Sequence, residues 1–226
     1  MGGSHGIGLG IVRRLVESGQ QVTVLSRTTG DLGDLTASVR HVVCDVTDGI
    51  AADAMPDSID GLAYCPGSIN LGPIRGVKPE TMRSDFDLNV VGAMLSLQAA
   101  LKGLKSAKGS VVFFSTVAVA QGMQMHASVA SVKGAVEGLT RSAAAELAPN
   151  VRVNALAPAL VDTPLAERLL SSDDKRAAMD RRHPLGRIGT VDDLAAAAVY
   201  LLGRESSWIT GQVIGVDGGL STLRTG

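Results

Sequence analysis

The sequence opens with MGGSHGIGLG (residues 1–10), in which Gly2, Gly6 and Gly8 follow the spacing GxxxGxG. The stretch IGLGIVRRLVESG (7–19) follows directly and has the amphipathic pattern of a helix. Glycines at such a turn let the backbone approach a pyrophosphate, whose charge is then bound by the free amides at the start of the helix. A simple glycine-rich turn or helix cap is the alternative, so the rest of the chain must decide.

Short apolar runs rich in β-branched residues recur at wide spacing, and most have the character of strands buried on both faces. These runs are QVTVLSR (21–27), VRHVVCDV (39–46), GLAYCPG (61–67), GSVVFFST (109–116), VRVNALAP (151–158) and QVIGVDGG (212–219). Helix-like segments separate several of them, at 7–19, 82–104, 133–147 and 191–203. This alternation predicts an α/β fold, a Rossmann-like doubly wound parallel sheet with helices on both faces.

Length and composition predict a single domain over residues 1–226, since 226 residues with 45% hydrophobic content can bury one substantial core. The formal net charge is -1 and the basic residues are scattered, so neither nucleic acid nor a membrane surface is an expected partner. Cys44, Cys65 and the four histidines have no disulfide or metal-ligand spacing, and we expect no metal. Because no charged leader is visible and the apolar run at 194–202 is too short to span a bilayer, we expect a cytoplasmic protein.

One element of the predicted sheet is missing from the sequence. In a doubly wound fold the glycine loop follows a central strand, whereas this sequence begins at the loop itself. Without that strand, its two neighbours would leave buried backbone groups unpaired. Either the natural start lies further upstream, or another segment fills the position; a sheet closed there by the chain's own residues would remove the first option.

The end of the first predicted strand indicates which nucleotide is bound. It carries Ser26 and Arg27, where an NAD enzyme usually has an acidic residue that binds the ribose 2′-hydroxyl. An arginine can instead pair with a 2′-phosphate, so this position favours NADP(H). A solvated arginine at a strand end is the alternative.

Together, these motifs resemble the short-chain dehydrogenase/reductase family over nearly the whole chain. GGSHGIG is similar to the cofactor loop of that family, and ITGQVIGVDGG (209–219) to its C-terminal strand. In YCPG only the glycine of the family's Asn-Asn-Ala-Gly turn is retained, and Ala159 replaces a glycine. The resemblance implies a cofactor-binding set of Gly2, Ser4, Gly6, Ile7, Gly8, Arg27, Asp45, Val46, Gly67, Lys133, Pro158 and Thr163.

The resemblance also implies a catalytic site. The family uses a serine, an asparagine and a Tyr-x-x-x-Lys pair on one helical face; the tyrosine protonates the substrate carbonyl and the lysine holds the nicotinamide ribose. Here Lys133 and Asn89 match, Thr116 keeps a hydroxyl at the serine position, and Val129 replaces the tyrosine. A positioned general acid contributes roughly 10²- to 10⁴-fold in rate, so another group must supply the proton or the chemistry has changed.

Two side chains are candidates for the missing proton donor. His126 lies three residues before Val129, and its imidazole could serve as the acid; a surface loop residue with no catalytic role is the alternative. Tyr64 would serve only if it faced the nicotinamide, and we expect it to pack near the adenosine half instead. The irregular stretch at 159–189 has the length of a substrate lid. Its five arginines could meet an acidic substrate or form a solvated helix face.

Three functions follow from this reading. The favoured one is an NADP(H)-dependent oxidoreductase acting on a carbonyl or alcohol group of a small molecule, with Thr116, Lys133, Asn89 and the non-standard proton donor His126. The alternatives are a catalytically silent NADP(H)-binding module and a structural subunit that pairs with an active paralogue. The Ala-rich segments at 133–148 and 190–203 suit helix packing across a symmetric interface, so a homo-dimer or homo-tetramer is expected in each case.

Overall fold

The computed structural model describes residues 1–224 and confirms the predicted α/β doubly wound fold. The strands are β1 (Val22–Ser26), β2 (Val39–Val43), β3 (Gly61–Ala63), β4 (Ser110–Phe114), β5 (Arg152–Pro158) and β6 (Val213–Val216). The α-helices are α1 (Gly6–Glu17), α2 (Pro79–Phe86), α3 (Gly92–Ala107), α4 (Ala127–Leu147), α5 (Asp173–Asp180) and α6 (Val191–Leu202). Short helical turns are η1 (Gly30–Ala37), η2 (Ala52–Ala54), η3 (Ile74–Gly76), η4 (Asp87–Val91), η5 (Pro164–Leu169) and η6 (Arg204–Ser206).

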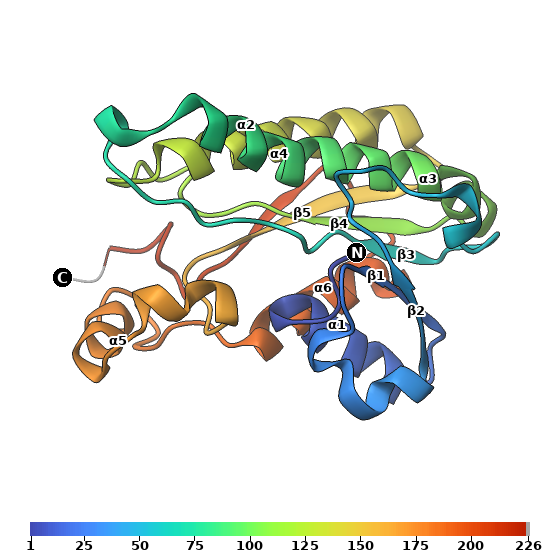
Figure 1. Ribbon diagram of the computed structural model, residues 1–226, viewed down its shortest axis with the longest axis horizontal. Helices are drawn as coiled ribbons and strands as arrows, with labels where there is room; N and C mark the ends of the chain where they lie inside the picture. The colour runs from blue at the N-terminus through green and yellow to red at the C-terminus, as the bar shows by residue number, and fades with distance from the viewer. Residues whose placement is uncertain (225–226) are drawn as a thin grey trace.

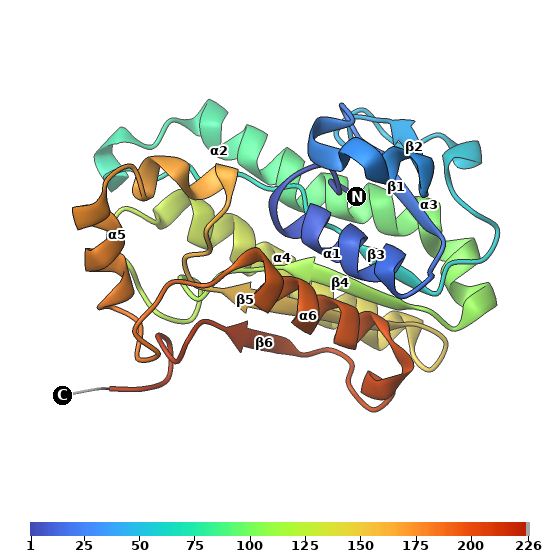
Figure 2. The ribbon, with the colours of Figure 1, turned by 90° about the horizontal axis from the view of Figure 1, so that it is seen from below.

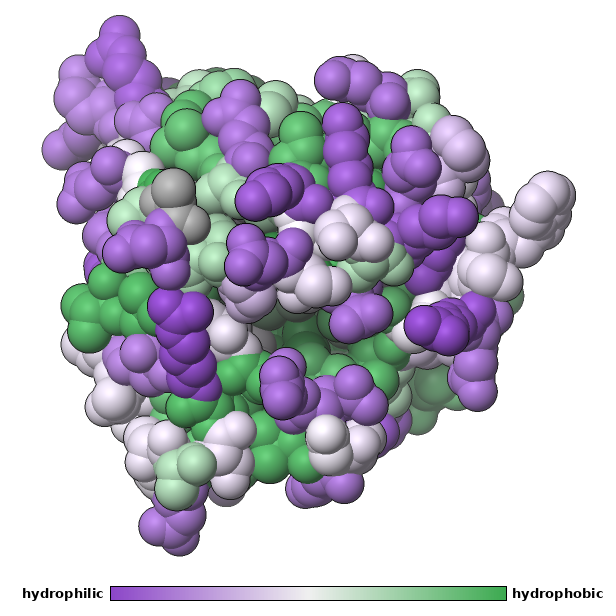
Figure 3. All heavy atoms as spheres, turned by 90° about the vertical axis from the view of Figure 1, so that its right-hand side faces the viewer, coloured by the Kyte–Doolittle hydropathy of each residue, from purple (hydrophilic) through white to green (hydrophobic). Residues whose placement is uncertain are grey.

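The helices form two layers around the sheet. Helices α2, α3 and α4 cover one face, and α1 and α6 cover the other (Figure 1; Figure 2). Alternation along β4 explains this, because successive side chains of a strand point to opposite faces. Val111 and Phe113 pack with residues of α3 and α4, whereas Val112 and Phe114 pack with residues of α6. At one end of the molecule hydrophilic residues project outwards, and hydrophobic atoms lie between and beneath them, including in a central hollow (Figure 3).

All strand pairs are parallel, but the sheet is divided. Strands β1 and β2 pair with each other, and β3, β4, β5 and β6 form a second sheet in that order. Within residues 1–224, no strand lies between β1 and β3. Met1 and Gly2 bridge the two: the Gly2 amide donates to the Leu25 carbonyl (2.8 Å), and the Cys65 amide donates to the Met1 carbonyl (3.1 Å). The Met1 amino group donates to the Ala63 carbonyl (2.8 Å), and burial lowers its pKa.

Three boundaries differ from the sequence-based prediction. Helix α4 begins at Ala127, ahead of the predicted start at 133, and the predicted helix at 82–104 is interrupted by the π-helical turn η4. The stretch at 159–189 is not irregular, since it contains η5 and α5. Helix α5 has no buried residue and therefore no clear hydrophobic period; its signal is the cap at Ser172, which accepts a hydrogen bond from the Lys175 amide (3.3 Å).

Candidate functional site

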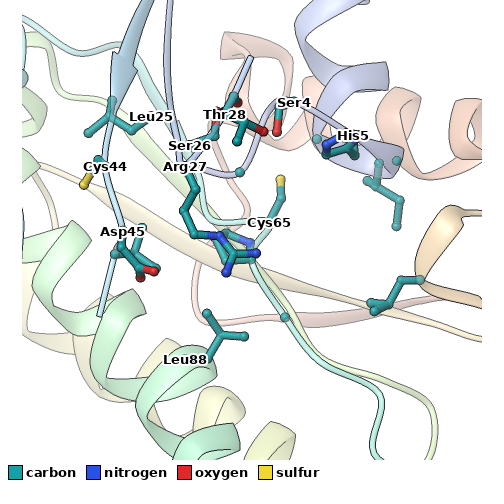
Figure 4. Close-up of a pocket in the computed structure, with 18 of the residues that line it drawn as sticks. Ser4, His5, Leu25, Ser26, Arg27, Thr28, Cys44, Asp45, Cys65 and Leu88 are labelled. Atoms are coloured by element: carbon teal, nitrogen blue, oxygen red, sulfur yellow. Dashed lines mark hydrogen bonds between the residues drawn. The ribbon is translucent and has the colours of Figure 1, made fainter. Parts of the chain in front are cut away.

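A cavity of about 770 Å³ lies beside the glycine loop, where β1, β2 and β3 end (Figure 4). Ligands of open α/β sheets bind at this edge, outside the carboxyl ends of the strands. The structure brings most of the predicted cofactor-binding set together here. The members that line this cavity are Gly2, Ser4, Gly6, Ile7, Gly8, Arg27, Asp45, Val46, Gly67 and Thr163.

The glycine loop is shaped for close backbone contact. Gly2 and Gly6 have positive φ angles of 71° and 51°, which side-chain-bearing residues rarely adopt. A Cβ on Gly8 would lie 2.2 Å from the Gly2 carbonyl oxygen, so only glycine fits at that position. Because α1 begins at Gly6, the unpaired amides of its first turn lie at the cavity wall and can bind an anion such as a pyrophosphate.

Arg27 extends from the end of β1 into the cavity, on the same side as Asp45 (Figure 4). Asp45 accepts hydrogen bonds from the Thr47 amide (3.0 Å) and hydroxyl (2.8 Å); these bonds, with a smaller effect of Arg27, lower the Asp45 pKa. In the described chain, no carboxylate forms an ion pair with Arg27. The guanidinium can therefore pair with an anionic ligand group such as a 2′-phosphate.

A second cavity, of about 270 Å³, adjoins the first and shares Ile7, Cys65, Gly67, Thr163 and Leu165 with it. Its wall is mostly apolar. It brings together Thr116, His126, Lys133 and Pro158 of the predicted site, and Val129 lines it as well. Lys133 and Pro158 therefore face this second cavity, while the glycine loop and Arg27 face the first.

The side chains of Lys133 and Asn89 both lie close to the backbone of Gly67. A Cβ on Gly67 would lie 3.2 Å from Asn89 Oδ1 and 3.4 Å from Lys133 Nζ, so the absent side chain leaves both groups close to the backbone. Lys133 Nζ donates to the Phe114 carbonyl (2.8 Å), and burial lowers its pKa to about 8. Asn89 Nδ2 donates to the Asp85 carbonyl (2.8 Å), while Asn89 Oδ1 is buried without a hydrogen-bond partner among residues 1–224.

The candidates for proton transfer differ in position. His126 lies at the start of α4, where Nδ1 bonds the Gln124 carbonyl (2.6 Å), which leaves Nε2 for other partners. The side chain of Val129 has no ionisable group and cannot act as a proton donor. Tyr64, expected to pack near the adenosine half, lies in the core cluster that includes Val46 and Leu88, two residues that line the first cavity; Tyr64 itself lines neither cavity and is 2% exposed. Its hydroxyl donates to the Leu88 carbonyl and its ring packs edge-on against Phe113, so it belongs to the core.

Several residues of the second cavity were missed by sequence analysis. Ser68 lines it and donates to Asp85, a carboxylate buried at the end of α2. His183 also lines it, with Nδ1 bonded to the Met179 carbonyl (2.8 Å). The segment DFDLN gives no sign that its first aspartate is buried, because burial here depends on partners from distant segments. In the sequence, the arginines of the 159–189 stretch were the feature that suggested contact between a lid and a substrate.

Most of those arginines do not face the cavity. Of Arg168, Arg176, Arg181, Arg182 and Arg187, only Arg182 lines it. Arg176 pairs with Asp162 (2.8 Å) and Arg187 with Asp193 (2.7 Å). The first pair joins α5 to the start of the 159–189 stretch, and the second joins the end of this stretch to α6.

No group of three or more metal-binding side chains occurs among residues 1–224. Over the same part of the chain, no helix is long and apolar enough to cross a bilayer. The cysteines Cys44 and Cys65 are free thiols, and burial raises the pKa of Cys65 to about 11.

Comparison with known proteins agrees with this geometry. A family model described as enoyl-(acyl carrier protein) reductase matches residues 2–221. L-xylulose reductase from Bos taurus is 33% identical, covering 96% of this chain and 93% of the relative. A protein of Xanthobacter autotrophicus named inactive 2-(S)-hydroxypropyl-CoM dehydrogenase 2 is also 33% identical, covering 94% of this chain and 100% of the relative.

Solved structures show the same relationship. A gluconate 5-dehydrogenase from Burkholderia cenocepacia, solved with NADP and tartrate, superimposes with a TM-score of 0.90 at 27% identity, covering 99% of this chain and 94% of that one. The ordered motifs, the two adjoining cavities and the full-length matches agree. The chain belongs to the short-chain dehydrogenase/reductase family.

Proposed function

We propose that this protein is an NADP(H)-dependent oxidoreductase that interconverts an alcohol and a carbonyl group on a small molecule. The observation that carries the proposal is the junction of the two cavities: they share Gly67 and Thr163, with the glycine loop and Arg27 on one side and Thr116 and Lys133 on the other. A cofactor bound across this junction would reach the second cavity. The NADP-bound gluconate 5-dehydrogenase supports the choice of cofactor.

The chain's own residues divide the work of binding. The amides at the start of α1 bind the pyrophosphate, Arg27 binds the 2′-phosphate, and Asp45 and Val46 border the adenine. Lys133 holds the nicotinamide ribose from the second cavity. When bound, the nicotinamide supplies or accepts a hydride.

The substrate end needs groups that orient the oxygen and exchange its proton. The Thr116 hydroxyl orients the substrate oxygen, and His126, with Nε2 not used by its bond to Gln124, exchanges the proton in place of the missing tyrosine. Asn89 supports Lys133 from beneath Gly67. Replacing His126 by Ala should lower turnover and flatten its pH profile; unchanged kinetics would rule out this role.

Nucleotide titration is the first experiment. Calorimetry should show micromolar binding of NADPH and much weaker binding of NADH. Arg27→Ala should weaken NADPH binding by roughly tenfold or more, because a charge-assisted hydrogen bond contributes about 1.5–3 kcal/mol. Arg13→Ala, on the exposed face of α1, is the matched control and should bind NADPH normally. Failure to bind either nucleotide would refute the proposal.

A second function, a catalytically silent NADP(H)-binding module, is favoured by one observation: Val129 lines the second cavity, and the family resemblance implies a proton-donating tyrosine at this position. The relative from Xanthobacter autotrophicus, which is named inactive, supports keeping this second function. The two functions differ in turnover, so oxidation or reduction of any member of an alcohol and carbonyl panel at a rate abolished by Lys133→Met would reject the silent module.

We also propose that the protein is a homo-dimer or homo-tetramer. Trp208 is 98% exposed and Tyr200 is 45% exposed, both near the end of α6, and such aromatic surfaces suit an interface between copies. Light scattering at micromolar concentration tests this, and a monomer would contradict it.

A further inference from the structure

The carboxylate of Asp85 is buried at the end of α2, with 4% of the residue exposed. Its Oδ1 accepts hydrogen bonds from the Ser68 hydroxyl (2.6 Å) and from Asn70 Nδ2 (2.7 Å), and its Oδ2 accepts one from the Ser128 hydroxyl (3.0 Å). Burying a carboxylate is costly without such donors. Asp85 therefore ties the loop after β3 and the first turn of α4 to α2.

These bonds fix the direction in which the Ser68 hydroxyl points. Asn70 Nδ2 can only donate, so Oδ1 of Asp85 is an acceptor, and the proton of Ser68 is directed at it. Asn89 Nδ2 is 3.2 Å from Ser68 Oγ and donates to it. A hydroxyl has one donor and two acceptor sites, so Ser68 has one acceptor site left.

Ser68 is one of the polar residues in the mostly apolar wall of the second cavity. It lines the second cavity together with Ile69, Leu71, Met123 and Val129. A ligand in this region must place apolar groups against these side chains. At Ser68 it can place only a group that donates a hydrogen bond.

We propose that Ser68 is a specificity-determining residue that accepts a hydrogen bond from a second hydroxyl group on the substrate, and that Asp85 is the residue that positions it. The substrate class is accordingly a diol or hydroxy-ketone with an otherwise apolar body. This inference rests on the proposed function, because Thr116 and His126 are assigned to the reacting oxygen and Ser68 is left for another group.

Binding to the NADPH-loaded protein tests this without turnover, since the reduced cofactor cannot oxidise an alcohol. The probes are trans-1,2-cyclohexanediol and cyclohexanol, titrated separately and followed by ligand-observed NMR. One hydrogen bond contributes about 0.5–1.5 kcal/mol, so the wild-type protein should prefer the diol by about two- to thirteenfold. Ser68→Ala should remove this preference while cyclohexanol binds as before.

A second variant tests the positioning role. Asp85→Asn replaces one acceptor oxygen by a donor, which releases the Ser68 proton from its fixed direction, so the ratio of diol to cyclohexanol affinity should fall. A merely structural role would weaken both ligands equally and leave the ratio unchanged. Ser131→Ala is the matched control, because that exposed hydroxyl bonds the Ala127 carbonyl within α4 (2.8 Å) and should leave the ratio at the wild-type value.

The outcomes separate this inference from the proposed function. If NADPH fails to bind in the loading titration, the proposed function falls, and this inference with it. If NADPH binds but the wild-type protein shows no preference for the diol, or Ser68→Ala keeps the preference, this inference alone is overturned.

Discussion

Replacing Lys133 by Met should increase the stability of the protein near pH 7 and abolish its function. The ammonium group of Lys133 is buried, and burial lowers its pKa from 10.5 to about 8. Since one pKa unit corresponds to about 1.36 kcal/mol, keeping this group charged in the fold costs about 3 kcal/mol at pH 7. Methionine removes that cost but also removes the hydrogen bond to the Phe114 carbonyl, worth about 1 kcal/mol. The net expected gain is about 2 kcal/mol.

The pH dependence identifies the cause of this gain. The pKa of Lys133 is lower in the folded than in the unfolded protein, so between pH 8 and pH 10.5 the unfolded state binds more protons and wild-type stability rises with pH. The difference between variant and wild type should therefore shrink over that window and reach zero or reverse near pH 10.5. Urea unfolding of both proteins at a series of pH values measures it, because other titrating groups cancel in the difference.

Two controls complete the experiment. Lys102→Met, on the exposed surface of α3, should change stability by less than about 0.5 kcal/mol at every pH. NADPH binding should be at least tenfold weaker for Lys133→Met and normal for Lys102→Met. A stability difference that does not change with pH would refute the assignment of a buried charge to Lys133.

Three further changes have definite expected outcomes. Gly8→Ala should abolish NADPH binding in calorimetry, because its Cβ would lie 2.2 Å from the Gly2 carbonyl oxygen; binding at the wild-type level would contradict the described loop. Val129→Tyr places a phenol one helical turn before Lys133 and should raise turnover of an alcohol panel by up to roughly 10²-fold, whereas no gain would show that proton transfer does not limit the rate. Thr190→Ala removes the capping box of α6 and should cost about 1 kcal/mol in urea unfolding with NADPH binding unchanged; a loss of NADPH affinity would show that the cap also shapes the cavity.

The fold could be predicted because its evidence is local. Glycine spacing, continuous apolar runs and turn residues each depend on neighbours in sequence, and they located all six strands. Helix α5 escaped because it is short and has no fully buried residue, so its few apolar side chains give no clear period. The interruption at η4 escaped because a π-helical turn has the same composition as the helices on either side of it.

The site could be predicted only where a residue acts through its own motif. The glycine loop and Arg27 line the first cavity, and Thr116 and Lys133 line the second. Asp85 could not be found in this way, because its donors come from loops at 68–70 and from residue 128, and only the folded chain brings them together. The direction of the Tyr64 side chain could not be predicted for a related reason, since it is set by contacts with Leu88 and Phe113.

The position of the first cavity between two walls has a consequence for amide hydrogen exchange. The first cavity is walled on one side by the ends of β1 and β2, and on the other by the loop after β3, whereas the direct backbone bonds across the division of the sheet pass through Met1 and Gly2. A nucleotide that binds both walls would hold them together. We therefore expect its binding to slow amide hydrogen exchange in β1 and β2, so that this slowing reports occupancy of the cavity.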